Sequence, residues 1–365
     1  MKKATIKDVA REAGVALSTV SNAMNGSSLV TEETREKVME AAKKLNYVPN
    51  MNGRFLKSGR SRQLCFITSS ISGEYFYRLT DSMNAECEKN GYCLNIVVTR
   101  DKNTMMNNVL GGRFDGFFLF EGERIAAEEL ERLEKEHIVA IMLDRKYVKK
   151  TIGSVVFDSY QAGYEITKHL INLGHKRIGF LDSASDIYDC SERKRGYQKA
   201  LEEHGIALLE KDILQGFFDE NISYSAVIAQ AHLYHRDLPT AYVAGNDKSA
   251  IGCVKALQFL GFRVPEDISV GLLRNLRIIV VDKIIFFRII GEAGFDDIEL
   301  SRYFTPSLTT VRNPIEEQGR AAVDLMVEIL DKKAEGRSRE LKGILVPRNS
   351  TGICMGSGSA VYHYV

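Results

Sequence analysis

Residues 4–26 have the sequence ATIKDVAREAGVALSTVSNAMNG, which predicts two short helices that meet at a tight turn. Thr5 is placed to cap the first helix, and Asp8, three residues later, is placed to reach back to it as a carboxylate. Gly14 is expected to end this helix, because glycine accepts the left-handed backbone that follows a helix C-terminus. The stretch therefore predicts a helix-turn-helix unit.

The second helix is expected to begin near Ala16 and to pack on the first through Val20, Ala23 and Met24. Its opposite face has the size and polarity to enter a DNA major groove. The residues placed for that role are Leu17, Ser18, Thr19, Ser21 and Asn22. A third helix is predicted from Thr31, its N-cap, to Leu45.

Charge separates this head from the rest of the chain. Residues 1–62 hold twelve Lys and Arg against six Asp and Glu, whereas residues 63–365 hold 37 against 42. The net charges are thus +6 and −5, which matches the +1 of the whole chain. A basic head favours phosphate binding over the alternative, a small helical bundle of another function.

The runs TIKDVAREAGVALSTVSNAMNG and TREKVMEAAKKLNYVPN resemble the DNA-binding head of the lactose/galactose repressor family. The resemblance implies a helix-turn-helix head over residues 1–49 and a hinge helix or linker over residues 50–62. It also implies that Leu56 enters the minor groove as a wedge. Further DNA contacts implied by it are Thr5, Asn25, Tyr47 and Asn50.

This head departs from the family pattern in three places. Ala16 stands where a capping serine is usual, Asn22 where an arginine is common, and Asn52-Gly53 where the hinge usually has better helix formers. The bases that are read therefore stay open. The polar, basic hinge itself predicts a segment that orders only with DNA and a partner subunit.

Length and composition suit a small head followed by a larger two-lobed body, since the chain has 365 residues and 44% apolar content. No leader pattern and no uncharged apolar run of about 18 residues occur, so we expect a cytoplasmic protein without a membrane span. Six cysteines without metal-ligand spacing predict reduced packing thiols, no metal and no cofactor.

From residue 63 onward, short apolar runs alternate with amphipathic ones, as in LCFIT, CLNIVV, GFFLF and VAIML, and again in VVF, RIGFL, AYVAG and ISV. This alternation predicts an α/β fold with two parallel sheets flanked by helices, and hence two lobes with a cleft between them. No nucleotide-phosphate loop or nucleophile motif occurs, so an enzyme is not expected.

The resemblance extends through this body, which implies a periplasmic-binding-protein-like, effector-binding and dimerisation domain over residues 63–350. Its expected parts are an N-lobe at about 63–157, a C-lobe at about 158–305, a return crossing near 306–330 and a tail at 351–365. Residues 271–293 interrupt the family pattern and are interpreted as an atypical insertion that leaves as a surface excursion. The alternative is that the insertion's own apolar run replaces the strand that leads into the GFDD sequence.

Effector contacts are expected where strands end at the cleft mouth. Arg193, in an RxxG sequence at a helix start, and Asp296 match family effector contacts. Tyr75 and Phe76 are predicted to form an aromatic wall, although ordinary core aromatics are nearly as good an interpretation. Asp144, Asn246 and Asp247 complete the set, with helix capping as the alternative for the last two.

These observations predict a homodimeric, sequence-specific transcriptional regulator of double-stranded operator DNA, most simply a repressor. A small-molecule effector, with a sugar or sugar derivative favoured and a purine also suitable, would control its operator affinity. The rival hypotheses are a sugar- or purine-binding protein or enzyme without DNA function, and a regulator controlled by a protein co-regulator.

Overall fold

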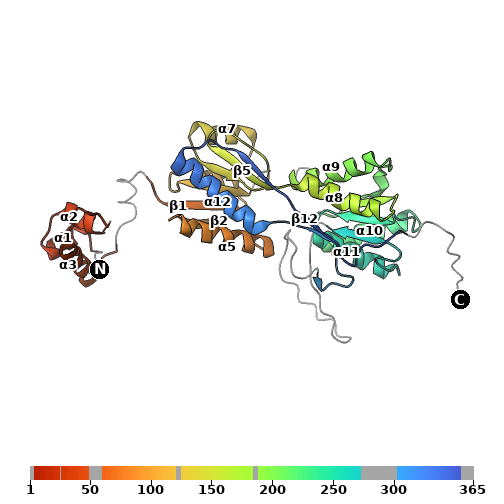
Figure 1. The fold of residues 1–365 in the computed structure, drawn as a ribbon, viewed down its shortest axis with the longest axis horizontal. Helices are drawn as coiled ribbons and strands as arrows, with labels where there is room; N and C mark the ends of the chain where they lie inside the picture. Colours follow the sequence, from red (N-terminus) through yellow and green to blue (C-terminus); the bar gives the residue numbers. More distant parts are fainter. Residues whose placement is uncertain are drawn as a thin grey trace, which may run out of the picture. The chain divides into compact units, whose positions relative to one another are not determined.

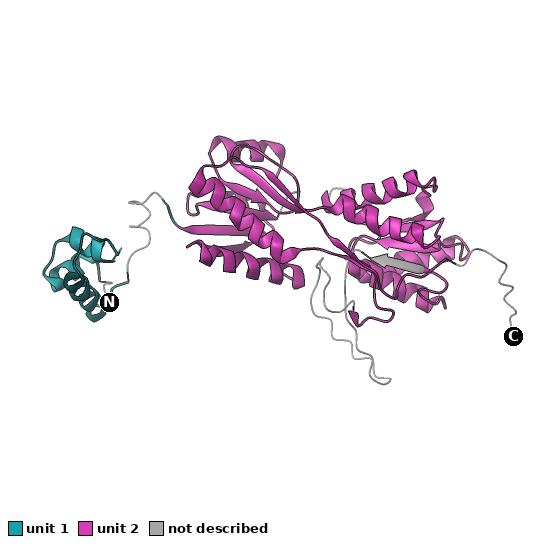
Figure 2. Cartoon of the chain, in the orientation of Figure 1, with its two compact units in different colours: residues 1–61 teal, residues 62–365 magenta. Residues whose placement is uncertain are grey.

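The computed structural model describes residues 4–24, 26–48, 60–120, 125–183, 188–272 and 302–354. The chain forms two compact units, residues 1–61 and 62–365, which Figure 2 shows in different colours. The predictions for Asn25, Asn50, Leu56 and Asp296 lie outside the described residues, as do most of the hinge and of the 271–293 insertion.

The first unit is the predicted three-helix head. Its helices are α1 (Ile6–Ala13), α2 (Leu17–Met24) and α3 (Glu32–Lys44). The capping prediction is confirmed, because the Thr5 backbone N–H donates to Asp8 Oδ2 at 2.9 Å. Gly14 ends α1 with φ +66°, a backbone conformation that glycine adopts without a steric penalty. Val9, Val20 and Val38, one from each helix, are buried together in the head core.

The second unit contains two parallel sheets, as predicted. The N-lobe sheet has the order β11-β5-β4-β3-β1-β2, and every neighbouring pair is parallel. Its strands are β1 (Gln63–Thr68), β2 (Cys93–Val98), β3 (Gly116–Phe120), β4 (Ala140–Met142), β5 (Ile152–Phe157) and β11 (Ser338–Leu341). The C-lobe sheet has the order β7-β6-β8-β9 and is also parallel. Its strands are β6 (Ile178–Asp182), β7 (Ile213–Gln215), β8 (Ala241–Ala244) and β9 (Ser269–Leu272).

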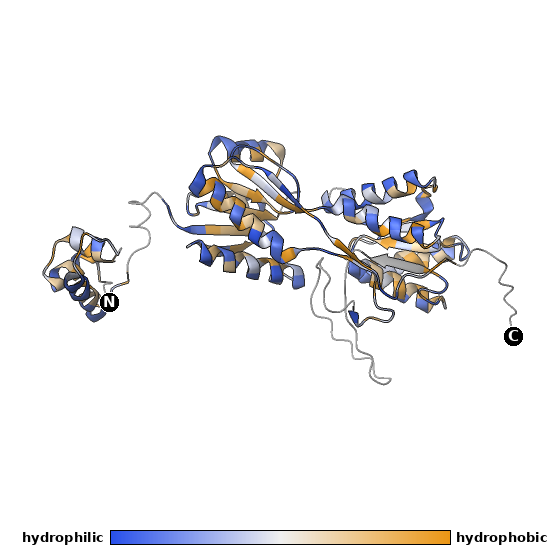
Figure 3. Ribbon diagram, viewed as in Figure 1, coloured by the Kyte–Doolittle hydropathy of each residue, from blue (hydrophilic) through white to orange (hydrophobic). Residues whose placement is uncertain are grey.

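Helices cover both faces of each sheet (Figure 1). In the N-lobe they are α5 (Glu74–Lys89) and α12 (Ile315–Lys332) on one face, with α6 (Lys102–Leu110) and α7 (Ala127–Lys135) on the other. In the C-lobe they are α8 (Ser159–Asn172) and α9 (Tyr188–Glu203) on one face, with α10 (Glu220–Leu233) and α11 (Asp247–Phe259) on the other. A short 3-10 helix, η1 (Glu210–Asp212), precedes β7. Figure 3 shows apolar residues gathered on the strands and polar residues on the outward helix faces.

Three connections link the lobes. The chain leaves the N-lobe after β5, returns between β10 (Thr310–Arg312) and α12, and leaves again between β11 and β12 (Ile344–Val346). Strands β10 and β12 pair antiparallel. The three connections lie close together, because a Cβ added at Gly343 would meet side-chain atoms of Val311 and Phe157. The N-lobe thus takes α12 and β11 from the C-terminal part of the chain.

The first two residues of the predicted insertion continue a strand. Gly271 and Leu272, the first two residues of the 271–293 block, belong to β9 and pair with Val243 and Ala244 of β8. The parallel ladder needs only backbone groups, so the register continues past the family-like ISV sequence. The remainder of the block lies in the part of the chain that the structure does not describe.

Candidate DNA-binding and effector-binding sites

Helix α2 presents a polar, partly exposed face from the head. Leu17 is 44% exposed and Ser18 is exposed, whereas Thr19, Ser21 and Asn22 are half-buried. Thr5 is exposed beside the N-terminus of α1, and Tyr47 is half-buried against the head core. These side chains remain candidate DNA contacts by position.

Sequence reasoning missed Arg35, which holds the C-terminal end of α2. Its guanidinium donates to the carbonyls of Ala23 and Ser27 at 3.1 Å each and to Glu32 at 3.2 Å. The last carbonyls of a helix have no partner within it, so the half-buried Arg35 cation supplies missing donors there and interacts favourably with the helix dipole. Arg35 lies in the predicted third helix, and only the tertiary structure shows which way it points.

Three aromatic rings meet at the carboxyl ends of the N-lobe strands. Tyr75 and Phe76 lie in the first turn of α5, as predicted, and Phe120 ends β3. The Tyr75–Phe76 and Phe76–Phe120 ring centroids are both 5.2 Å apart in edge-to-face geometry, and Tyr75–Phe120 are 5.6 Å apart. Tyr75 is buried and its hydroxyl donates to Gln318 at 3.0 Å. The rings form an apolar wall with one fixed polar anchor.

Arg193 is the central polar residue of the C-lobe site. It lies in the second turn of α9, which begins at Tyr188, so its predicted place at the helix start is wrong. The side chain is 1% exposed, and Nη1 donates to the carbonyl of Gly245 at 2.7 Å. Phe218 lies under it, with its ring centroid 5.9 Å from Cζ. Burial lowers the pKa of Arg193, and nearby acidic groups, Asp189 first, oppose that shift.

The residues after β8 are buried at the start of α11. Asn246 caps this helix, since Oδ1 accepts from the Ser249 backbone at 2.8 Å, and its amide donates to the carbonyl of Phe218 at 3.1 Å. Asp247 is 1% exposed and also contributes to the electrostatic environment of Arg193. The capping role of Asn246 is thus present, and through Phe218 it also shapes the floor beneath Arg193.

Phe120 and Phe218 were not predicted as site residues. Phe120 is the last letter of an apolar strand and gives no sign of lying at the strand end rather than inside the core. Phe218 has φ +56°, a left-handed conformation that turns its ring toward Arg193 and Gly245. That conformation is unusual for a bulky residue, and the sequence does not reveal it. Asp144 is half-buried and lies two residues after β4. It remains a candidate only because it follows the end of a strand in the same sheet as the aromatic wall.

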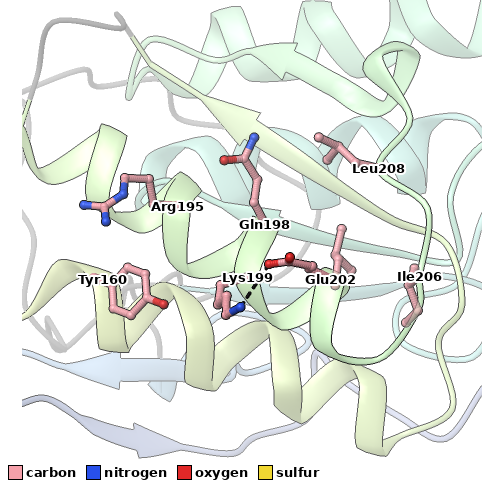
Figure 4. Close-up of a pocket in the computed structure, with 8 residues that line it drawn as sticks. Tyr160, Arg195, Gln198, Lys199, Glu202, Ile206 and Leu208 are labelled. Carbon is pink, nitrogen blue, oxygen red and sulfur yellow. Dashed lines mark hydrogen bonds and ion pairs between the residues drawn. The ribbon is translucent and has the colours of Figure 1, made fainter.

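Two open cavities of the described residues lie away from these groups. One, of about 460 Å³, is on the outer face of α8 and α9 and is lined by Tyr160, Arg195, Gln198, Lys199, Leu201, Glu202, Ile206 and Leu208. Figure 4 shows Lys199 paired with Glu202, both on α9, among its lining residues. A larger one, of about 1190 Å³, lies between the C-terminus of α11 and residues 302–307. The convergent buried groups, rather than either cavity, mark the candidate effector site.

Four of the six cysteines are buried packing residues, Cys354 is half-buried and Cys93 is exposed. Cys65, Cys87, Cys190 and Cys253 are buried, and burial raises the pKa of the Cys65, Cys87 and Cys190 thiols to about 12. Cys93 is exposed, so its prediction as a packing residue is wrong.

The described residues contain no group of His, Cys, Asp and Glu arranged for a metal ion. Within the same residues, no helix is both long and apolar enough to cross a membrane.

Family models match almost the whole chain. Residues 5–50 match bacterial regulatory proteins of the lacI family, and residues 61–344 match the periplasmic binding proteins and sugar binding domain of the LacI family. The chain belongs to the LacI family of bacterial regulatory proteins. It is therefore a DNA-binding transcriptional repressor with an effector-binding body, and it is not an enzyme.

Curated relatives of this LacI-family protein include the HTH-type transcriptional repressor PurR of Vibrio vulnificus (strain CMCP6). The two are 32% identical over 354 residues, which cover 95% of this chain and 98% of the relative. PurR of Haemophilus influenzae (strain PittEE) is 31% identical, and the alignment covers 91% of this chain and 93% of that relative.

Among solved structures, the lac repressor dimer bound to operator and the anti-inducer ONPF is similar in fold, with a TM-score of 0.78 and 24% identity. It covers 96% of this chain and 100% of its own. The transcriptional regulator CelR in complex with cellobiose has a TM-score of 0.67 and 23% identity, with 95% and 99% covered.

Proposed function

We propose that this repressor binds a pseudo-palindromic operator as a homodimer in the cytoplasm, and that a small ring-shaped metabolite between the lobes sets its operator affinity. The observation that carries the effector part is the pairing of an aromatic wall, Tyr75, Phe76 and Phe120, with a buried arginine, Arg193. Rings supply a stacking face and the guanidinium supplies directed donors, which suits a purine base or a sugar.

Exposed apolar residues support a dimer. Ile96 and Val98 lie exposed on β2, the edge strand of the N-lobe sheet, and Tyr77 of the adjacent α5 is 68% exposed. An uncovered apolar strand edge favours pairing with a second copy. Two heads also double the DNA contact that one three-helix unit offers.

DNA binding is tested by mobility shift with genomic fragments, comparing the full chain with a truncation that lacks residues 1–61. We expect only the full chain to bind, with an affinity that falls steeply as salt rises. Leu56→Ala should weaken operator binding more than non-specific binding, because a minor-groove wedge acts only on the specific, deformed site. Equal losses on both DNAs would contradict the wedge.

The effector is tested by thermal shift with cellobiose, ribose, glucose 6-phosphate, guanine and hypoxanthine as probes. A compound that binds only the folded state raises Tm by mass action. The proposal expects a rise with one chemical class and its loss in Arg193→Met, with Arg195→Met on the exposed side of the same helix as control. No rise with either class, together with operator binding, would favour a protein co-regulator instead.

The dimer is tested by sedimentation of the native protein and of Ile96→Glu. A charge buried at the proposed β2 interface should convert dimer to monomer. A monomeric native protein at the concentrations that bind operator would refute this part.

A further inference from the structure

Helix α12 reaches both functional ends of the N-lobe. Its first turn follows Asn313-Pro314, where the chain returns from β10. Its last turn lies beside Arg62, the residue that precedes β1 and to which the segment from the head connects. Figure 1 shows α12 running beside the sheet between these two ends. An 18-residue helix is about 27 Å long, so one rigid element spans the lobe.

Gln318 connects the first turn of α12 to the sheet. It is 2% exposed, and its amide nitrogen donates to the carbonyls of Leu143 and Val155 at 3.0 Å each. The β4–β5 ladder ends at the pair Met142–Ser154, so both carbonyls lie beyond its last residue pair. The Gln318 amide supplies the donors there that the short strand β4 does not.

The same amide also orients the aromatic wall. Its carbonyl oxygen accepts the hydroxyl proton of Tyr75 at 3.0 Å, so both ends of the Gln318 side chain are bonded. A movement of Tyr75, or of Leu143 immediately after β4, therefore displaces the Gln318 side chain of α12 directly. Breaking one of these bonds removes a hydrogen bond in a buried network, which is costly because water does not replace it there.

Helix α12 packs closely against its neighbours. A Cβ at Gly319 would lie 2.7 Å from Ser82 Oγ of α5, and one at Gly153 of β5 would lie 2.8 Å from Leu325. One at Gly116 of β3 would overlap Met326. The helix thus sits in contact with a helix and two strands, and a shift at its first turn is carried along rather than absorbed by bending.

Asp331 connects the last turn of α12 to the start of β1. Its carboxylate accepts from the Tyr92 hydroxyl at 3.1 Å and pairs with Arg62 at 3.5 Å, while the Arg62 guanidinium lies 4.9 Å from the Tyr92 ring centroid. The Arg62 backbone N–H donates to Asp115 at 2.9 Å. A carboxylate near a helix C-terminus opposes the helix dipole, and the Arg62 cation and the Tyr92 hydroxyl offset that cost.

We infer that α12 couples the effector site to the hinge: Gln318 is the positioning residue at the effector end, and the Asp331–Arg62 pair is the corresponding contact at the hinge end. This inference rests on the proposed function and specifies how its effector signal reaches the head. It assigns the coupling to one helix with two defined ends, which makes it testable by mutation at each end.

The test is hydrogen–deuterium exchange of the full-length protein, read by mass spectrometry in the segment 60–64. Asp331→Asn weakens the hinge-end contact directly and sets the scale of the effect. Gln318→Leu and Tyr75→Phe change only the effector end, some 20 Å away along the helix. Glu328→Gln is the matched control, because Glu328 lies on the same helix but pairs with Arg337 and Arg339 instead of Arg62.

We expect Gln318→Leu and Tyr75→Phe to accelerate exchange in segment 60–64 by about three-fold or more, as Asp331→Asn does, with Glu328→Gln unchanged. Tyr75→Phe removes a single hydroxyl, so it keeps the test valid if Gln318→Leu fails to fold.

Acceleration confined to Asp331→Asn, or equal acceleration in Glu328→Gln, would overturn the coupling. Because exchange needs neither ligand nor operator, this result is independent of the ligand screen. If no probe raises Tm but Gln318→Leu and Tyr75→Phe still accelerate exchange in segment 60–64, the small-molecule effector is refuted and the coupling through α12 stands.

Discussion

Replacing Gly196 by alanine should separate two helices of the C-lobe and displace the buried arginine of the effector site. Gly196 is the glycine of the RxxG sequence and lies where α9 crosses α8. An added Cβ would lie 2.1 Å from the carbonyl oxygen of Tyr160, a backbone atom that cannot rotate away. The approach is mutual, because a Cβ at Gly163 of α8 would lie 2.2 Å from the carbonyl of Arg193.

The balance of energies favours destabilisation. Ordinary Cβ contacts begin at 3.4 Å, so the helices must separate by about 1 Å. Overpacking of this kind costs roughly 1–3 kcal/mol, and the Arg193–Gly245 bond of 2.7 Å, once stretched, adds about 1.5–3 kcal/mol. Alanine regains about 1 kcal/mol of helix propensity over glycine. The net loss is roughly 1.5–5 kcal/mol, which lowers Tm on the order of 10 °C in a body of this size.

Thermal and urea denaturation followed by circular dichroism measure this change, with Gln198→Ala, at a half-buried position on the outer face of α9, as the control. A Gly196→Ala protein whose Tm equals that of the native protein would refute the close helix crossing. A lowered Tm with an unchanged Tm rise on ligand would instead show that Arg193 is not displaced.

Three further outcomes follow from single features. Thr5→Ala removes the hydroxyl that donates to Asp8 Oδ2 at 2.7 Å, and should lower the local stability of the head by about 1 kcal/mol, measured by hydrogen exchange of α1 amides. Burial lowers the pKa of His175 in the folded protein. The unfolded chain therefore binds this proton more readily as pH falls below about 6.5, and folding stability falls with it. Tm should drop from pH 7.5 to 5.5, and it should drop less in His175→Gln. Deleting residues 273–292, which spares β9, should preserve folding and raise solubility by removing apolar runs, whereas a deletion starting at residue 271 also shortens β9 and should lower Tm. An unfolded 273–292 deletion would show that the block had become part of the core.

The periodic parts of the fold could be predicted because local sequence determines them. Thr5 and Asp8 can cap a helix because they are three residues apart. Gly14 follows the helix in the left-handed backbone conformation, which glycine adopts more easily than other residues. The apolar runs that became β1, β3 and β5 are hydrophobic on both faces, as buried parallel strands must be. Head, α/β class and two sheets were therefore determined by the sequence.

The tertiary structure decided what meets what across long separations. Gln318 contacts Tyr75, 243 residues away, and Asp331 contacts Arg62 and Tyr92, and no periodicity relates such positions. Phe218 turns toward Arg193 through a positive φ that a phenylalanine rarely adopts. Which buried polar groups pair depends on how the three connections bring the returning chain onto the first sheet. Side-chain partners across the site are thus a property of the packed fold, whereas the elements that carry them are a property of the sequence.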